Sequence, residues 1–520
     1  ELDYKGWWPP RLASMFHNTA FAFLARVLSG GHLFPKRVPE SGAAVKLEDD
    51  VQIVDWEGED DPENPKNWSF AYKVFLSFLV CLITTFVYMG SSIVSPATQL
   101  IMDEFHVGQP VAALSLSLFV WGYGLGPCLL SPLSEISAVG RNWIYIISLG
   151  IFFLLQVPTA LVGNLPGFLI LRFLSGITGS PVLATGGASM GDMWRIDGGF
   201  ANSIAFWGFA ATGGPVLGPV IGGFSSQALG WRWTIWPLLF ASATGWVAIF
   251  LFLPETSEQA ILTMRARELR KKTGSTNLYS RGELEDRHVS APRLLYETFC
   301  RPVELMLTEP ILLFSNGYIA YVYGIVYCFF EAYPITMTEK RNFNAGQLGL
   351  SFTSGWALTT IALGFYLYYN NTFVARKFRE NAWEPEYRMV VCVVGGVLMA
   401  GSLFWFGWTS FGSVLWISPV AAYGVHIMGV FYLFMGFFGY IGENYPRYLA
   451  SAFASNSLLR AGVGGAFPIF STIMFEHMTV QGGCSMLGGL GLALIPVTVL
   501  FYYKGNSLRA RSKKAGMPPL

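Results

Sequence analysis

A few charged side chains lie inside stretches of this sequence that are otherwise apolar and about 20 residues long. Arg172 lies in FLILRFLSG, and Glu331 lies in YGIVYCFFEAYP. An ionised group deep in a bilayer is costly, so it normally faces a cavity or a polar partner and marks a functional site. Because a guanidinium keeps its proton, we expect Arg172 to set the field around a neighbouring acid or substrate. The alternative is that Arg172 extends outward to the membrane interface.

Glu331 is the natural candidate for proton exchange. Tyr323, Tyr327 and Glu331 follow one another at intervals of four residues, which places two phenols and an acid on one helix face. If this face borders a central cavity, the rings could bind flat apolar or cationic substrates while the acid responds to protons. The alternative is a hydrated acid near the end of its helix.

Three further polar positions lie in predicted spans. Asn456 and Arg460 also lie four residues apart, in SAFASNSLLRAGVGG, and either contact substrate or pair across the helices. His426 is isolated among Tyr, Gly and Met residues, which is more typical of a helix contact than of a titrating site.

The segment GPVLGPVIGG, from Gly214 to Gly223, combines helix-bending proline with glycines that permit close packing. A moving membrane helix needs both properties, although a tightly packed static helix would need the glycines too. The positions of interest are Gly214, Gly218, Pro219, Gly222 and Gly223.

The loop SPLSEISAVGR carries Glu135 and Arg141. A carboxylate there could cap the N-terminus of a facing helix, while the arginine pairs with an acid at the end of a neighbouring span. Asp192 is well placed to be that acid. An ordinary solvated role for Glu135 and Asp192 is the alternative.

These residues must be positioned by membrane helices. The chain is 52% hydrophobic and only 13% charged, about half the charged share of a soluble protein. The sequence predicts an all-α membrane protein with twelve spans, near residues 73–95, 109–133, 143–163, 166–190, 199–223, 233–253, 310–335, 346–370, 389–408, 411–440, 449–475 and 482–503.

Most Lys and Arg residues fall in the termini and in the loops on one side, so we expect both termini in the cytoplasm. The spans then group into bundles over 73–253 and 310–503, joined by a cytoplasmic loop over 254–309, with cytoplasmic tails over 1–72 and 504–520. In this loop, MRARELRKKTG predicts a basic helix lying along the membrane or, alternatively, in solvent. The stretch near Leu12 to Leu28 predicts a second interfacial helix, and the acidic run before Trp68 predicts disorder, so the N-terminal tail is partly disordered.

The sequence gives little support for a metalloprotein, an ATP-driven protein, a nucleic-acid-binding protein or an enzyme. The six cysteines and six histidines form no zinc or disulfide pattern, and no Walker A motif is present, so we expect no metal, cofactor or ATP dependence. A net charge of +1 argues against nucleic acid. Ser189 lies in a G-x-S-x-G pattern, but a membrane helix is the wrong context for that nucleophile, so we expect no enzyme.

Several segments resemble, in order and spacing, the fungal twelve-span drug:proton antiporters of the major facilitator superfamily: DPENPKNW, GYGLGPCLLSPLSE, LRFLSG, GPVLGPVIGG, FLPET and FFEAYP. The resemblance covers about residues 60–515. The glycine segment matches the antiporter motif of the fifth helix, and Arg172 matches a buried arginine tied to proton coupling. Glu135 departs from the aspartate usual in the superfamily's loop motif. The resemblance implies two six-helix bundles, each built of three-helix repeats, with a central site and alternating access.

The sequence therefore predicts a monomeric multidrug exporter in the plasma membrane that exchanges protons for amphipathic drugs, toxins or metabolites. Two alternatives remain: an exporter dedicated to one endogenous compound such as a polyamine or secondary metabolite, and a non-transporting receptor that kept the transporter fold.

Overall fold

Long apolar helices make up most of the structure, a computed structural model that describes residues 18–29, 45–48, 51–195, 199–275, 277–286, 296–512 and 514–515. The first six long helices form one bundle: α3 (Phe70–Ser92), α5 (Gln109–Glu135), α6 (Gly140–Leu161), α7 (Leu165–Met193), α8 (Phe200–Leu229) and α9 (Ile235–Phe252). Short elements connect them: η2 (Ser95–Ala97), α4 (Thr98–Phe105) and η3 (Trp231–Thr234).

The second bundle consists of α14 (Pro310–Tyr333), α16 (Thr353–Tyr369), α18 (Arg388–Trp408), α19 (Ile417–Asn444) and α20 (Leu449–Arg511). Its short elements are η4 (Tyr296–Cys300), α13 (Arg301–Thr308), η5 (Pro334–Glu339), α15 (Ala345–Ser351), η6 (Asn370–Val374), α17 (Ala375–Arg379), η7 (Pro385–Tyr387) and η8 (Pro446–Tyr448).

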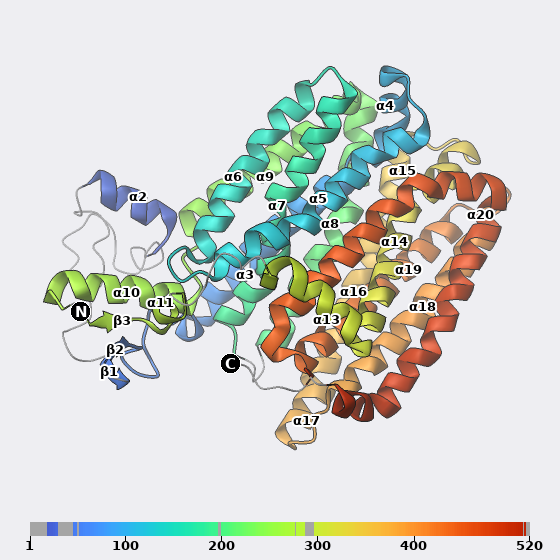
Figure 1. Cartoon of the computed structure of the whole chain (residues 1–520). Helices are drawn as coiled ribbons and strands as arrows, with labels where there is room; N and C mark the ends of the chain where they lie inside the picture. The colour runs from blue at the N-terminus through green and yellow to red at the C-terminus, as the bar shows by residue number, and fades with distance from the viewer. Residues whose placement is uncertain are drawn as a thin grey trace.

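Helix α20 contains two membrane-length segments. Its 63 residues would extend about 95 Å as one straight helix, roughly three times the hydrocarbon thickness of a bilayer. The backbone leaves the helical region at Thr479, where φ is 61° and ψ is 161°, and the helix turns back on itself (Figure 1). Eleven helical segments among the described residues are long and apolar enough to span a membrane, and because α20 doubles back, they provide the twelve predicted spans.

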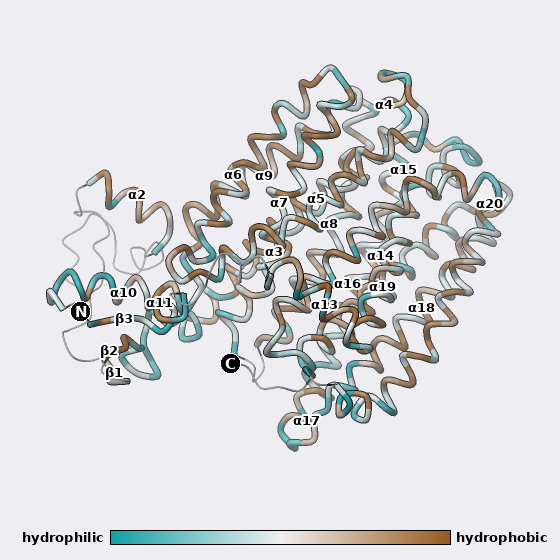
Figure 2. Tube along the Cα trace, viewed as in Figure 1, coloured by the Kyte–Doolittle hydropathy of each residue, from teal (hydrophilic) through white to brown (hydrophobic). Residues whose placement is uncertain are grey.

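The two bundles lie side by side, with the first at upper left and the second at lower right in Figure 1. We call the end that carries α10 and the end of α20 the basal end, and the end that carries α4 the distal end (Figure 1). Hydrophobic residues cover the middle of the helices, whereas hydrophilic ones gather in the segments at both ends (Figure 2). This distribution is the one a bilayer imposes on a multi-pass protein.

A small mixed structure, the basal subdomain, lies beside the basal end of the first bundle. It contains β1 (Val45–Glu48), β2 (Val51–Val54), α10 (Glu258–Thr273), β3 (Leu278–Tyr279) and α11 (Arg281–Asp286). Strand β2 pairs antiparallel with β1 and parallel with β3, so that the N-terminal segment and the loop between the bundles share one sheet. The buried side chains of Val54, Ala266, Leu269 and Leu278 form its own apolar core.

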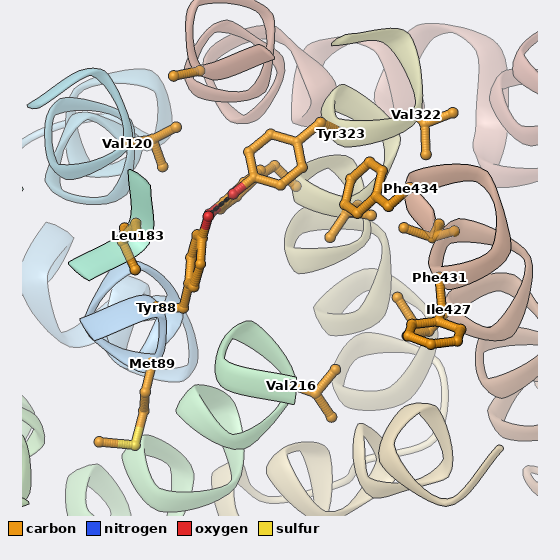
Figure 3. Close-up of a cluster of buried hydrophobic side chains, with 14 of the residues drawn as sticks. Tyr88, Met89, Val120, Leu183, Val216, Val322, Tyr323, Ile427, Phe431 and Phe434 are labelled. Atoms are coloured by element: carbon orange, nitrogen blue, oxygen red, sulfur yellow. Dashed lines mark hydrogen bonds between the residues drawn. The ribbon is translucent and has the colours of Figure 1, made fainter. Parts of the chain in front are cut away.

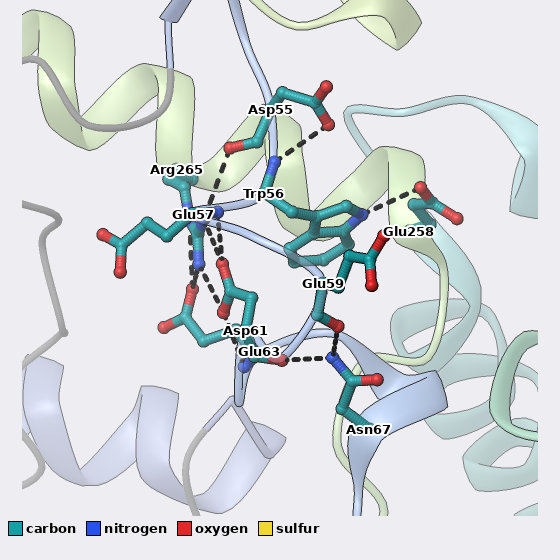
Figure 4. A network of polar contacts seen from close by, with 9 residues as sticks. All are labelled: Asp55, Trp56, Glu57, Glu59, Asp61, Glu63, Asn67, Glu258 and Arg265. Atoms are coloured by element: carbon teal, nitrogen blue, oxygen red, sulfur yellow. Dashed lines mark hydrogen bonds and ion pairs between the residues drawn. The ribbon is translucent and has the colours of Figure 1, made fainter.

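A buried ion-pair network holds the acidic segment before α3 against α10 (Figure 4). Arg265 lies 2.7 Å from carboxylate oxygens of both Asp61 and Glu63, and its guanidinium lies 5.3 Å from the ring centre of Trp56. Burial alone would raise the pKa of Asp61, but hydrogen bonds from Arg265 and from two backbone N–H groups bring it below its ordinary value. The short helix η1 (Pro65–Asn67) then leads into α3.

Two sequence predictions are corrected here: disorder of the acidic run, and a membrane-surface position for the basic helix, for which a position in solvent was the alternative. The acidic run over 57–68 is folded rather than disordered, because Arg265 neutralises part of its charge. The apolar side of α10 is covered by the sheet and the N-terminal segment rather than by a membrane, since Ile261, Ala266 and Leu269 are buried in protein.

The other predicted interfacial helix falls partly within the described residues, as α2 (Ala20–Leu28). Phe21 packs edge-on against Phe250 of α9, and Phe23 against Trp143 of α6. Helix α2 therefore adjoins the basal ends of α6 and α9, and its contact with lipid stays a prediction.

Candidate functional site

The glycine segment of α8 packs directly on the backbone of α3. A Cβ at Gly218 would lie 2.9 Å from the carbonyl oxygen of Met89, and one at Gly214 would lie 2.8 Å from that of Thr85. Gly222 makes a still closer approach to the carbonyl of Ile93. These distances leave no room for a side chain, so the glycines set the separation of the two helices.

The prolines of this segment serve the same contact. Pro219 has no N–H, so the carbonyl of Pro215, four residues earlier, loses its helical donor. The hydroxyl of Ser92 in α3 donates to that carbonyl at 2.8 Å. On its other side, α8 touches the second bundle, where Gly223 lies against Ala345 and the carbonyl of Pro219 lies against Gly349. Helix α8 is therefore held between α3 and α15.

Arg172 is completely buried in the first bundle and does not extend to the interface. Its Nε donates to the carbonyl of Ser115 in α5 at 2.8 Å, and its Nη2 donates to the carbonyl of Gly90 in α3 at 2.7 Å. The guanidinium also lies 4.5 Å from the ring centre of Phe119. Of the neighbouring acid or substrate expected from the sequence, no acid pairs with Arg172 among the described residues, and an effect on substrate stays a prediction. Arg172 instead ties α7 to α3 and α5.

Four tyrosines meet where the two bundles touch. Tyr88 and Tyr123 come from the first bundle, and Tyr323 and Tyr327 come from the second. The Tyr123 hydroxyl contacts that of Tyr323 and lies 3.0 Å from that of Tyr327, which donates to Ser91 Oγ at 3.0 Å. Tyr88 and Tyr323 point toward each other from opposite bundles (Figure 3). All four are buried, so the predicted phenols of α14 do face the central interface.

Arg460 lies beside these tyrosines and is 8% exposed. Its guanidinium packs on the rings of Tyr323, Phe434 and Phe438 at 4.7, 6.0 and 5.9 Å from their centres. Its Nη2 donates to the Tyr88 hydroxyl at 3.4 Å, the one hydrogen bond that Arg460 makes with the described residues. This arginine therefore joins the two bundles.

Asn456 has a different environment from Arg460, although they share a helix. Its side chain donates to Oδ1 of Asn316 in α14 at 3.0 Å, and the Asn316 amide donates to Ser455 at 2.9 Å. Both asparagines are buried within the second bundle. Of the two alternatives from the sequence, the geometry matches pairing between helices rather than contact with substrate.

Glu331 lies at the distal part of α14 and is 7% exposed, so it is not the hydrated rim acid considered from the sequence. Its carboxylate accepts from the Gln109 amide of α5 at 2.6 Å and from the Thr472 hydroxyl of α20 at 3.0 Å. The bond to Gln109 crosses between the bundles. Nearby, the Gln227 side chain of α8 accepts from the N–H of Gly346, which adds a second distal link.

Arg141 pairs with its predicted partner, and the cap of α6 comes from a carboxylate that was not considered from the sequence. Arg141 Nε lies 2.6 Å from Asp192 Oδ2, and its Nη2 lies 3.1 Å from Oδ1. The carboxylate that accepts the first N–H groups of α6 belongs to Glu255, which bonds to the N–H of Arg141 at 3.0 Å and of Asn142 at 3.1 Å. Glu135 is exposed at the end of α5. Burial raises the pKa of Glu255, against the effect of these hydrogen bonds.

Arg141, Asp192 and Glu255 belong to the first bundle or to the segment that follows it. A matching pair occurs in the second bundle, where Arg388, at the start of α18, lies 2.8 Å from Glu443, near the end of α19. In both bundles the third long helix begins with an arginine that pairs with an acid at the end of the fourth. The two bundles therefore carry corresponding ion pairs at the same places.

The remaining candidates, His426 and Ser189, contact neighbouring side chains of the protein. His426 is buried, with its ring 4.7 Å from that of Phe329. Ser189 lies within α7 and pairs with the Tyr145 hydroxyl at 2.8 Å. No group of three or more metal-binding side chains occurs in the part of the chain that the structure describes. Sequence reasoning missed Tyr88, Ser91, Tyr123 and Gln109, although GYGLGP, the segment that holds Tyr123, was noted as a motif.

Comparisons with known proteins agree with this architecture. Residues 80–469 match the family model described as Major Facilitator Superfamily. The chain is 40% identical to "Transporter mfs1" of Schizosaccharomyces pombe, with 89% of this chain and 88% of that protein covered.

Two other relatives have names that refer to drugs. The chain is 37% identical to "Multidrug transporter FLR2" of Candida glabrata, over 94% of this chain and 84% of that protein. It is 38% identical to "Fluconazole resistance protein 1" of Saccharomyces cerevisiae, over 91% of this chain and 86% of that protein. Among solved structures, the proton:xylose symporter XylE has the same fold, with a TM-score of 0.59 and 14% identity over 84% of this chain and 96% of that one.

Proposed function

This chain belongs to the major facilitator superfamily, and from that premise we propose that it is a proton-coupled drug efflux transporter of the plasma membrane. It exports amphipathic drugs, toxins or metabolites and works as a monomer. The names of its relatives, "Multidrug transporter FLR2" and "Fluconazole resistance protein 1", support the substrate class. The observation that carries the mechanism is the buried group of polar aromatic side chains contributed by both bundles at their interface.

Such an interface suits alternating access, in which two bundles rock about a central site. The tyrosine hydroxyls bond to one another across the bundles, so each can exchange a protein partner for a substrate group when the bundles part. The aromatic rings offer flat surfaces to apolar molecules. The links of Glu331 to Gln109 and of Gln227 to Gly346 hold the distal ends together, as expected of a state closed on that side.

The direct test is transport by the purified full-length chain in liposomes, with an imposed pH gradient and radiolabelled fluconazole. Fluconazole and cycloheximide are suitable probes because relatives are named for resistance to them. Gradient-dependent movement of either compound supports the proposal. Movement of neither, with transport of a single polyamine or secondary metabolite, would indicate a dedicated exporter. Binding without any transport would indicate a receptor.

We assign proton exchange to Glu331. Protonation removes the charge that strengthens the bond from Gln109, so it loosens one distal link between the bundles. Glu331→Gln fixes the neutral state. We expect fluconazole efflux to fall about tenfold, the effect of one lost charge-assisted hydrogen bond. The remaining efflux should no longer vary between external pH 5 and 8, measured at equal surface expression.

Gln109→Ala is the matched control, since it removes the same link but keeps the acid. Its efflux should be reduced yet still depend on pH. A Glu331→Gln variant whose pH profile matches the wild type would assign proton exchange to another group.

Membrane orientation can be tested with a native thiol. Cys300 is exposed at the basal end, whereas the other five cysteines are buried or half-buried. If the basal end is cytoplasmic, a membrane-impermeant maleimide should label Cys300 only after cells are permeabilised. Ser413→Cys, in the exposed distal turn between α18 and α19, should be labelled in intact cells in a Cys300→Ser background. The opposite pattern would reverse the proposed topology.

A further inference from the structure

Four arginines lie within the long helices of the bundles and are largely withdrawn from solvent, and they differ in how one edge of the guanidinium is used. That edge is formed by Nε and Nη2, which together can bind a carboxylate side-on through two parallel hydrogen bonds. The four residues are Arg141, Arg172, Arg388 and Arg460.

In three of these arginines both nitrogens of this edge lie close to a carboxylate or carbonyl oxygen, although the contact of Arg141 Nε is an ion pair without hydrogen-bond geometry. In Arg141 they face the Asp192 carboxylate at 2.6 and 3.1 Å, and in Arg388 they face a Glu443 oxygen at 3.2 and 2.8 Å. In Arg172 they donate to two backbone carbonyls at 2.8 and 2.7 Å.

Arg460 does not use the edge in this way. Its Nη2 makes a long bond of 3.4 Å to the Tyr88 hydroxyl, and its Nε has no hydrogen-bond partner among the described residues. Its charge has no carboxylate partner there either. A buried cation with an unused N–H and no carboxylate partner is energetically costly, and a ligand that accepts from this N–H would remove that cost.

The surroundings of Arg460 indicate the shape of that ligand. The guanidinium packs against the rings of Tyr323 from α14 and of Phe434 and Phe438 from α19. These rings fix the orientation of the guanidinium, and the N–H groups along its edge remain able to donate hydrogen bonds. Tyr88 approaches that edge from the first bundle. A ligand that replaces the Tyr88 hydroxyl would enter between the bundles and find aromatic surfaces beside the cation.

We propose that Arg460 binds the carboxylate of aromatic organic acids through its Nε and Nη2, so that organic anions are among the substrates. The inference rests on the proposed efflux function, whose substrate class it narrows. A carboxylate pairs with both nitrogens of the edge and neutralises the buried charge, whereas a neutral amide of the same shape does neither.

The probes are 2-naphthoate, which is ionised at neutral pH, and 2-naphthamide, its neutral counterpart. Binding to the purified full-length chain in nanodiscs is measured at pH 7.5. Wild-type protein should bind 2-naphthoate at least about tenfold more tightly than 2-naphthamide. Arg460→Gln should abolish this preference but still bind 2-naphthamide measurably, which also shows that the variant is folded. Arg460→Lys should keep only part of the preference, because an ammonium lacks the planar edge.

Two further variants complete the test. Tyr88→Phe removes the competing hydroxyl, so the preference should persist or increase. Arg376→Gln is the matched control, because Arg376 packs on the ring of Phe373 but lies exposed in α17. If Arg460→Gln fails to fold, a reduced preference in Arg460→Lys together with a full preference in Tyr88→Phe supports the site, and any other combination overturns it.

An equal affinity of wild-type protein for the two probes, or a preference that survives Arg460→Gln, would overturn the anion site. Fluconazole transport in liposomes is scored separately. Efflux of fluconazole without any preference for 2-naphthoate refutes this site and leaves the proposed function intact. A clear preference without transport of any compound supports the site and refutes efflux.

Discussion

Replacing Gly218 with leucine is expected to abolish transport. The added Cβ alone would lie 2.9 Å from the Met89 carbonyl and 3.0 Å from the Ile93 nitrogen, both in the rigid backbone of α3. Helix α8 can make room only by moving away, which would also break the bond from Ser92 to the Pro215 carbonyl and disturb the contact with α15. We expect efflux to reach background in Gly218→Leu and an intermediate rate in Gly218→Ala, measured at matched surface expression.

The chain provides internal controls for this prediction. Gly364 in α16 and Gly401 in α18 are exposed helical glycines with no atom near an added Cβ. Leucine at either position should leave efflux close to wild type. Normal efflux by Gly218→Leu would show that close contact between α3 and α8 is not needed, and loss of efflux in the control variants would show that leucine is harmful at any helical glycine.

Hydropathy predicted the spans well because the bilayer requires apolar segments of fixed length. The predicted span 389–408 corresponds to α18, Arg388–Trp408, and the span 310–335 corresponds to α14, Pro310–Tyr333. The turn within α20, at Thr479, falls between the predicted spans 449–475 and 482–503. Hydropathy could not show that the helix bends back at Thr479 without an intervening loop.

The sequence could not predict contacts between segments that lie far apart along the chain. The spacing of Tyr323 and Tyr327 identified one helix face, but their partners Tyr88 and Tyr123 come from helices whose rotation is set by packing. The same limit applies to the cap of α6. Glu135 is nearer in sequence, yet the chain after α9 brings Glu255 to the helix N-terminus. The pairing of β2 with β3 joins segments more than 200 residues apart, so local patterns contain no trace of it.

Arg172→Ala is expected to reduce transport to background, and Arg172→Lys to reduce it by about tenfold or more. The arginine reaches α5 through Nε and α3 through Nη2, so its planar group holds three helices together. Lysine keeps the charge but has a single nitrogen that cannot match both directions. Alanine leaves the carbonyls of Gly90 and Ser115 without this donor and removes a buried charge from the first bundle.

A purely structural role and a coupling role make different predictions for these variants. Because Ser91 lies between Arg172 and Tyr327, a rearranged Arg172 should disturb the contact between the bundles as well as the first bundle itself. If this coupling operates, Arg172→Lys should lose more efflux than its loss of folded protein accounts for. Arg232→Lys is the control, since Arg232 forms a half-exposed ion pair with Glu104 and should tolerate the change. Loss of efflux in strict proportion to lost folded protein would assign Arg172 to stability alone, and wild-type efflux in both Arg172 variants would remove it from the mechanism.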